Sequence, residues 1–555
     1  MISPKLPDFD LATWKAEPWH VRLKMICQAW AADGYGTPLA LYLLYALKIG
    51  GYIGAWLFFC TFTTGYGLDN LGAWWSSDQA FLKAILWTTL FEGLGLGCGS
   101  GPLTARYVPP VGGALYFLRP GTTKLPLIEG LPIVGGHRRT LLDVALYAAT
   151  LGVLLWGLTA ANVTAVHLIP YVALVPLMAL GDKTLFLVFR AEHYLSVCLA
   201  WLLASRHAEK IASAKVVWMA IWWWAATSKL NVHFPAVMGV MTSNAPITRG
   251  TPLRRLVYRS FPDDLRPSRF AAAMAHFGTV FEYLIPALLL LSDGGPVTTA
   301  ALVGITVFHL FILFNVPMGV PLEWNVIMIY GAWVLFGTHA EVAAWTIEGP
   351  ALWAWLLGFH LVLPLYGSQY PHRVSFLLAM RYYAGNWAHS TWLFRGDAIT
   401  KLDQLTKWSP TPRAQLRLLY DDDTVDALLA KVGAFRRMHI LGRVLNRVWP
   451  HATDDPEAVE WVDGEVIAGM VVGWNFGEGH LHDEQLLRAV QAQCGFAPGE
   501  LRIITCESQP IFTPSCQWRV TDAATGELAR GTVAMDELAR EHPWPLSSDP
   551  AAMAS

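Results

Sequence analysis

VTTAALVGITVFHLFILFNV, residues 297–316, contains no Asp, Glu, Lys or Arg. An apolar helix of about 20 residues crosses the hydrocarbon layer of a membrane. Only a helix or a closed barrel can pair all its backbone polar groups in that layer. The stretch therefore predicts a transmembrane helix, and comparable runs occur on both sides of it.

The overall composition agrees with a membrane protein. Of the 555 residues, 54% are hydrophobic and only 15% are charged, whereas soluble domains carry roughly a quarter charged residues. The charged residues collect after about Pro371. We therefore predict an all-α polytopic membrane bundle of about ten transmembrane helices, followed by a small soluble α+β domain. The apolar runs are 38–62, 79–98, 141–160, 166–180, 184–204, 214–228, 271–292, 297–316, 324–338 and 351–367.

Two of these runs have an alternative interpretation. Pro170 and Pro176 interrupt the fourth run, and Gly181, Asp182 and Lys183 separate it from the fifth. Residues 166–204 are therefore either two spans or a re-entrant pair.

The positions of lysine and arginine predict the orientation. The N-terminal head and the loops at 106–139 and 249–269 are rich in these residues and would share the cytoplasmic side. Arg206, Lys210 and Lys215 are an exception to the pattern. An even number of spans places both termini in the cytoplasm, so we predict a multi-pass protein of the cell (plasma) membrane.

The C-terminal third has a different pattern. The aromatic cluster YYAGNWAHSTWLF, 382–394, suits a surface along the membrane, and strands are predicted at 464–474, 501–508, 516–522 and 527–535. A helix is predicted over 483–494, and Gly526 suits the hairpin turn DAATGE. The predicted divisions are a cytoplasmic N-terminal segment at 1–37, the transmembrane domain at 38–370, a helical connector at 371–450, the α+β domain at 451–546 and a disordered tail at 547–555.

Several functional classes lack support in the sequence. The head has no apolar core of a cleaved signal peptide, and the seven cysteines form no CxxC pair, so we interpret them as reduced packing residues. No basic face suggests a nucleic-acid partner. His480, His482 and Asp483 could bind a metal, but a turn and helix cap is the favoured interpretation, and no metal site is predicted.

The 26 tryptophans, including Trp74, Trp75 and Trp222–Trp224, suit an interfacial belt.

Ionisable residues inside the apolar runs are the best functional candidates, because charge at the bilayer centre costs on the order of 3 kcal/mol. Lys229 ends a very apolar run, and its free amine could act as a base if it is sheltered from water. The alternative is that Lys229 extends to the interface and His193 only bonds a neighbouring helix. The other candidates are His233, His309, Asn315 and Glu323.

Three motifs resemble the HTTM (horizontally transferred transmembrane) domain, a bacterial module similar to vitamin K-dependent gamma-carboxylase. They are DKT with AEHYLSV in 182–197, SKLN at 228–231, and FHLFILFNVPMG with EWNVIM in 308–328, and the resemblance covers roughly 141–335. It implies Lys229 as the catalytic base, His193 as its support and menaquinol as the cofactor, which His309, Glu323, Asn315 and His233 would help to bind. The large extracytoplasmic domain of the carboxylase has no counterpart, so carboxylation of protein glutamate is not expected. The whole chain also resembles an uncharacterised actinobacterial membrane-protein family.

Two functions from different classes follow. One is a quinol-dependent, carboxylase- or oxygenase-like enzyme with a lipid-soluble small molecule as substrate. The other is a non-catalytic lipid-handling or scaffold protein of the cell envelope, with membrane lipids and a protein bound to its C-terminal domain as partners. A transporter is less favoured, because the sequence shows no internal repeat.

Overall fold

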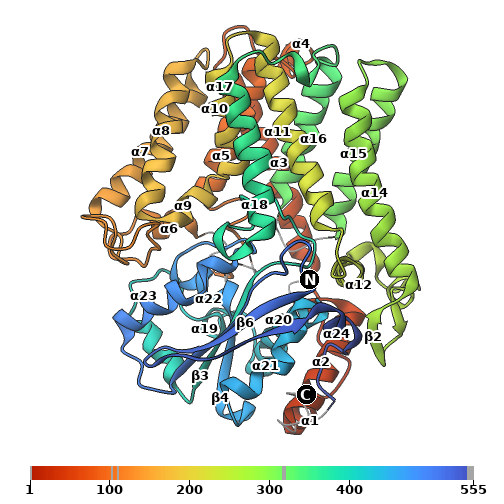
Figure 1. Ribbon diagram of the computed structural model, residues 1–555, viewed down its shortest axis with the longest axis vertical. Helices are drawn as coiled ribbons and strands as arrows, with labels where there is room; N and C mark the ends of the chain where they lie inside the picture. Colours follow the sequence, from red (N-terminus) through yellow and green to blue (C-terminus); the bar gives the residue numbers. More distant parts are fainter. Residues whose placement is uncertain (1–2, 102–103, 105, 109–111, 316–320, 547–555) are drawn as a thin grey trace.

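The computed structural model describes residues 3–546, apart from 102–103, 105, 109–111 and 316–320. Helices fill one half of the molecule, and a five-stranded sheet with its own helices fills the other half (Figure 1). We call these halves the helical layer and the C-terminal domain. The predicted disordered tail at 547–555 lies outside the described residues.

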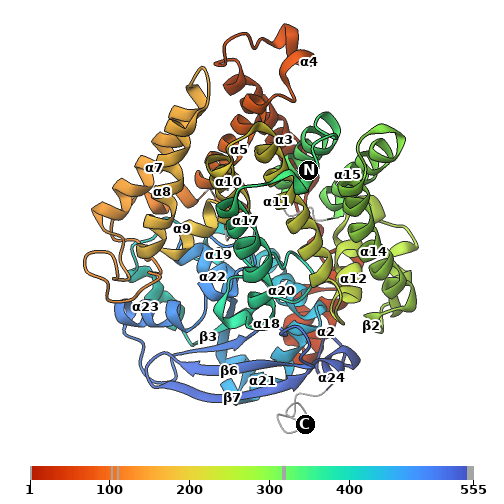
Figure 2. The ribbon, with the colours of Figure 1, turned by 45° about the horizontal axis from the view of Figure 1, so that its top comes forward.

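Within the part of the chain that the structure describes, five helices of the helical layer are long and apolar enough to cross a membrane. They are α3 (Leu39–Cys60), α7 (Leu141–Thr159), α14 (Arg269–Leu291), α15 (Gly295–Asn315) and the continuous helix Pro350–Gln369, which contains α17 (Pro350–Leu357) and α18 (Leu363–Gln369). The α7–α8 and α14–α15 pairs form opposite flanks of this layer (Figure 2). These five helices are candidate membrane spans, and the predicted number of about ten spans is not confirmed.

The other predicted spans are helical but shorter, broken or more polar. α5 (Asp78–Gly93) has 16 residues, nearly all buried by protein, and α8 (Ala165–Gly181) has 17. α11 (His207–Ser228) carries Glu209, Lys210 and Lys215 in its first half. The remaining pieces are α9 (Lys183–Val188), a π-helical turn at Ala191–Leu195, α10 (Ser196–Leu203), α16 (Leu322–Ala332) and a second π-helical turn at Trp333–Thr338.

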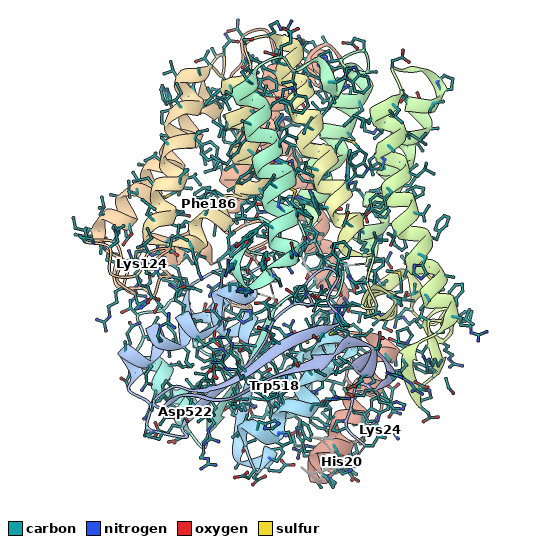
Figure 3. All side chains as sticks on the ribbon, in the orientation of Figure 1. His20, Lys24, Lys124, Phe186, Trp518 and Asp522 are labelled. Carbon is teal, nitrogen blue, oxygen red and sulfur yellow. The ribbon has the colours of Figure 1, made fainter. Side chains whose placement is uncertain are left out.

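The break after α8 has a specific cause. Asp182 caps α9 by accepting a hydrogen bond from the Thr184 N–H at 3.1 Å, and its other carboxylate oxygen binds Arg139 at 2.7 Å. A second buried pair joins Lys124 to Asp143 at 2.6 Å (Figure 3 labels Lys124). The loop before α7 is thus fixed to both ends of the α7–α8 pair, which explains the charged residues at this break.

The sheet of the C-terminal domain is antiparallel, in the order β4-β3-β5-β6-β7. The predicted strands at 501–508, 516–522 and 527–535 and the helix at 483–494 are confirmed, and Gly526 has a φ of 89° in the predicted turn. Trp518 and Asp522 mark β6 in Figure 3. The bounds are β3 His389–Arg395, β4 Val459–Asp463, β5 Leu501–Cys506, β6 Ser515–Asp522, β7 Gly526–Ala534, α19 Pro412–Leu416, α20 Asp422–Met438, α21 Val444–Ala452, α22 Gly464–Val471, α23 Glu484–Cys494 and α24 Met535–Arg540.

Two predictions for this domain are wrong. Residues 464–471 form α22 instead of a strand, because Asp463 accepts a hydrogen bond from the Glu465 N–H and starts a helix that is buried on all sides. The aromatic cluster 382–394 does not lie on an exposed membrane surface. Its second half is β3, an internal strand of the sheet. Its first half is mostly buried between the helical layer and the C-terminal domain.

The N-terminal segment packs against the C-terminal domain, since α2 (Trp19–Asp33) and α1 (Leu11–Ala16) lie along α20. The two basic loops of the helical layer contact the same domain through Arg106, which binds Ser409, and Arg266, which binds the Arg540 carbonyl oxygen. All three basic segments therefore lie on one side of the helical layer. The short elements between α11 and α14 are α12 (Phe234–Asn244), α13 (Leu253–Leu256), β1 (Tyr258–Ser260) and β2 (Asp264–Pro267).

Candidate functional site

A cavity of about 500 Å³ lies where the helical layer meets the C-terminal domain. Helices α11, α12, α14, α15 and α16 form its walls. Residues before β3, in α20, and in and after α22 form its floor. The lining is almost wholly apolar or aromatic. Phe277, on α14, lines the cavity and is 73% exposed on a helix that can span a membrane. The cavity therefore reaches the lipid-facing surface of the helical layer.

Lys229 lines this cavity and forms an ion pair with Glu282 of α14. The side chains are 10% and 4% exposed, respectively. Lys229 lies at the C-terminal end of α11, and its ammonium is 5.4 Å from the ring centre of Phe234 and 5.7 Å from that of Phe308. The amine thus faces protein and has the Glu282 carboxylate as its partner. Glu282 was missed as a site residue, although a lone carboxylate in the run 271–292 is itself unusual.

His309 also lines the cavity, and both of its ring nitrogens have partners. Nε2 lies 3.1 Å from Trp222 Nε1, and Nδ1 lies 2.8 Å from Asn325 Oδ1. Because an indole N–H can only donate, Nε2 accepts, and Nδ1 carries the proton that it donates to Asn325. His309 is therefore held as a neutral imidazole in one tautomer. Trp222 is buried here and does not belong to an interfacial belt; Trp74, predicted for the same belt, is buried too.

His193 is not brought to Lys229. It lies on the π-helical turn before α10 and packs against Trp218 and Tyr194, with ring centres 4.4 and 4.5 Å away. Trp218 precedes Lys229 by three turns of α11, about 16 Å along the helix axis. Among the residues that line the cavity, His193 is absent. The predicted pairing of this imidazole with the lysine amine is therefore wrong.

The remaining predicted residues lie outside the cavity. Asn315 donates a hydrogen bond to the Phe311 carbonyl oxygen at 2.8 Å, at the end of α15. His233 Nε2 lies 2.9 Å from Gln509 Oε1 of the C-terminal domain. Glu323 belongs to a separate polar cluster. Of the predicted set, the structure brings only Lys229 and His309 to the cavity.

The polar cluster of Glu323 surrounds Arg190, which sequence reasoning did not select. Arg190 Nε binds Glu192 at 2.6 Å, and its Nη1 is 3.5 Å from both Glu92 Oε1 and Cys98 Sγ. Lys48 lies 3.5 Å from Glu323. Arg190 has a φ of 47°, which costs a non-glycine residue about 1 kcal/mol. Its ion pairs hold it in this conformation, at the inner end of the cavity.

The donors in this cluster could hold a cation. Glu92, Cys98 and Glu323 each place one ligand atom within 4.8 Å of the others. Gly97 permits the approach, because a Cβ there would lie 2.2 Å from Glu92 Oε2. Arg190 and Lys48 already lie against these groups, so we interpret the cluster as an ion network of the protein's own side chains.

In the C-terminal domain, His480 bridges two carboxylates. Its Nδ1 is 3.1 Å from Glu478 and its Nε2 is 3.0 Å from Glu507. Burial lowers the pKa of His480, but these carboxylates outweigh burial and raise that pKa to about 10. His482 bonds Ser390, and Asp483 caps α23 by accepting from the Gln485 N–H. The turn-and-cap interpretation of this motif is confirmed.

His480→Gln should remove a pH dependence of stability. Because the pKa of His480 is raised from 6.5 to about 10, its contribution is complete below about pH 6.5 and is lost as the pH rises toward 10. Between pH 6 and pH 9 the wild type should therefore lose on the order of 3 kcal/mol that the variant does not lose. Unfolding of the full chain at both pH values measures this. The control is His451→Gln, an exposed histidine of the same domain, which should follow the wild type. An equal loss in His480→Gln contradicts the prediction.

The lipid-facing helices, the apolar cavity between the layers and the attached sheet domain define a polytopic helical membrane protein. The chain belongs to the family described as "Transmembrane protein of unknown function (DUF3556)", whose model matches residues 1–554. The comparison with curated proteins gives no match. The comparison with solved structures gives no match either. The HTTM resemblance finds no support in these comparisons and stays a prediction.

Proposed function

We propose that this transmembrane protein binds a lipid-soluble molecule in the cavity between its helical layer and its C-terminal domain. The cavity itself carries the proposal, because it has a volume of about 500 Å³, an apolar lining and an edge on the lipid-facing surface. Ligand sites typically have volumes of about 300–1,000 Å³ and are mostly apolar with a few polar groups. A molecule dissolved in the membrane can enter this cavity without crossing water.

A row of rings leads from the lipid-facing edge to the buried end. The centres of successive rings are 5.3–6.2 Å apart. Such a row offers a continuous apolar surface along which a hydrocarbon or isoprenoid chain can lie. In order from the membrane, the rings are Phe277, Phe281, Phe308, His309, Trp324 and Tyr382.

Lipid handling fits this geometry better than quinol oxygenation does. A catalytic base must be free to accept a proton from the substrate, whereas the Lys229 amine is already bound to the Glu282 carboxylate. His309 has both nitrogens occupied, and His193 packs elsewhere. Menaquinol, with an apolar ring and an isoprenoid chain, remains a ligand of the proposed class. We propose that it would be held in the cavity instead of being oxygenated there.

Gly278→Leu should block binding. Gly278 lines the cavity on α14, and a Cβ there meets no atom within 4 Å, so the leucine side chain would extend into open space in the cavity. Lipids that copurify with the full-length protein are measured by mass spectrometry. A lipid that copurifies with the wild type in near-stoichiometric amount should fall at least about tenfold in the variant, because the leucine takes its place.

Gly152→Leu is the matched control. Gly152 lies on α7, another helix able to span the membrane, and a Cβ there also meets nothing within 4 Å. This variant should retain the lipid. Added menaquinone should quench the fluorescence of the wild type and the control, since Trp222, Trp324 and Trp387 line the cavity. Equal lipid retention in Gly278→Leu and Gly152→Leu would contradict the proposal that the cavity binds a lipid.

A further inference from the structure

Arg190 has an unused hydrogen-bond donor at the inner end of the cavity. The residue lines the cavity and its side chain is 1% exposed. Nε and Nη1 contact Glu192, Glu92 and Cys98, but Nη2 has no partner among the described residues. A guanidinium N–H can only donate, and a buried donor without an acceptor is costly. A ligand with an acceptor oxygen at this end of the cavity would therefore satisfy the unpaired Nη2 donor.

The position of Tyr382 connects this donor to the rest of the cavity. Its hydroxyl lies 3.4 Å from Glu192 Oε1, the oxygen that also binds Arg190 Nε. Tyr382 is the last ring of the row that begins at the exposed Phe277. A lipid whose chains follow the row would thus present its polar head to Arg190.

The surrounding charges define the kind of head that fits. Arg190 and Lys48 face three carboxylates, those of Glu92, Glu192 and Glu323. At the cavity floor, Glu465 and Asp463 share the single cation of Arg436. Among the described side chains, the positive charges at this end do not outnumber the negative ones, so none is left over to hold a phosphate. A neutral oxygen satisfies the donor without adding a negative charge to this end.

We propose that the inner end of the cavity holds the uncharged head of a neutral lipid, whose carbonyl or hydroxyl oxygen accepts a hydrogen bond from Arg190 Nη2. This inference rests on the proposed function and narrows its ligand to lipids without a charged headgroup. Diacylglycerol has both kinds of oxygen and is the reference compound. Phosphatidic acid with the same acyl chains differs from it only by the phosphate.

The test titrates both lipids into the full-length protein and follows tryptophan fluorescence, with native mass spectrometry to count bound lipids. Dioleoylglycerol should bind at least about tenfold more tightly than dioleoyl phosphatidic acid. Arg190→Met combined with Glu192→Met removes the donor together with its main ion-pair partner. Glu92, whose contact with Arg190 is the longer one at 3.5 Å, keeps the hydrogen bond that it accepts from the Cys98 N–H. This double variant should lose about tenfold in affinity for dioleoylglycerol, and Gly152→Leu should lose none.

The outcomes separate the two proposals. If neither lipid binds the wild type saturably, or if Gly278→Leu binds both as well as the wild type does, the cavity is not a lipid site and both proposals fail. If Gly278→Leu weakens binding but phosphatidic acid binds as tightly as dioleoylglycerol, the neutral-head inference alone fails. It fails equally if the folded double variant binds dioleoylglycerol like the wild type.

Discussion

Arg436→Met is expected to lower the free energy of unfolding by about 4 kcal/mol, the largest effect that we anticipate. Arg436 holds Asp463 through two hydrogen bonds, at 2.9 and 3.0 Å, and Glu465 through one at 3.1 Å. All three side chains are at least nine-tenths buried. The substitution leaves two buried carboxylates without the cation that they share, which is far more costly than losing an exposed pair. Chemical unfolding of the full chain measures the difference.

Arg413→Met is the matched control. Arg413 also pairs with two carboxylates, Asp426 and Glu460, but its side chain and theirs are about a quarter to a third exposed. Water can solvate the carboxylates that remain, so the expected loss is below about 1 kcal/mol. Comparable losses in the two variants would show that burial does not set the strength of the Arg436 network.

Lys229→Met is expected to destabilise the protein by about 3 kcal/mol, because it leaves Glu282 without its cation at the edge of the cavity. Removing both charges in Lys229→Met/Glu282→Gln should restore most of this loss, since the amide needs no counter-ion. Thermal unfolding of the purified protein measures both variants. If the double variant is as unstable as the single one, Lys229 supports the fold through its packing instead of its charge.

The site was only partly predictable from the sequence. Lys229 could be recognised because a charge in an apolar run is costly wherever it occurs. Its partner lies 53 residues away on another helix, and no local pattern connects the two. His193 was predicted to support Lys229 because of the order of the three HTTM-like motifs along the chain. The π-helical turn at Ala191–Leu195 instead places its ring against Trp218. Arg190 lies only three residues before His193, yet the cluster around it includes Glu92 of α5 and Glu323 of α16, which only the tertiary fold brings together.

The errors in the C-terminal domain have a common physical origin. Apart from Glu465, residues 464–471 are apolar or glycine, because they are buried between the sheet and the helical layer. Such a run carries no periodicity that separates helix from strand. β3 is buried along nearly its whole length, so it lacks the alternation of an exposed strand. The exposed hairpin of β6 and β7 alternates, and its strands were predicted correctly.

The floor of the cavity has a consequence for the order of synthesis. The ribosome finishes the last helix of the helical layer at Gln369, yet the residues that close the cavity from below continue to Gly477. β3 directly follows the floor residues at 376–387. It pairs on its two sides with β4 and β5, which are both synthesised later. More than a hundred further residues must therefore emerge before the chain can complete the floor of the cavity. If the cavity binds a lipid as we propose, a lipid bound before that point would be covered when the sheet forms.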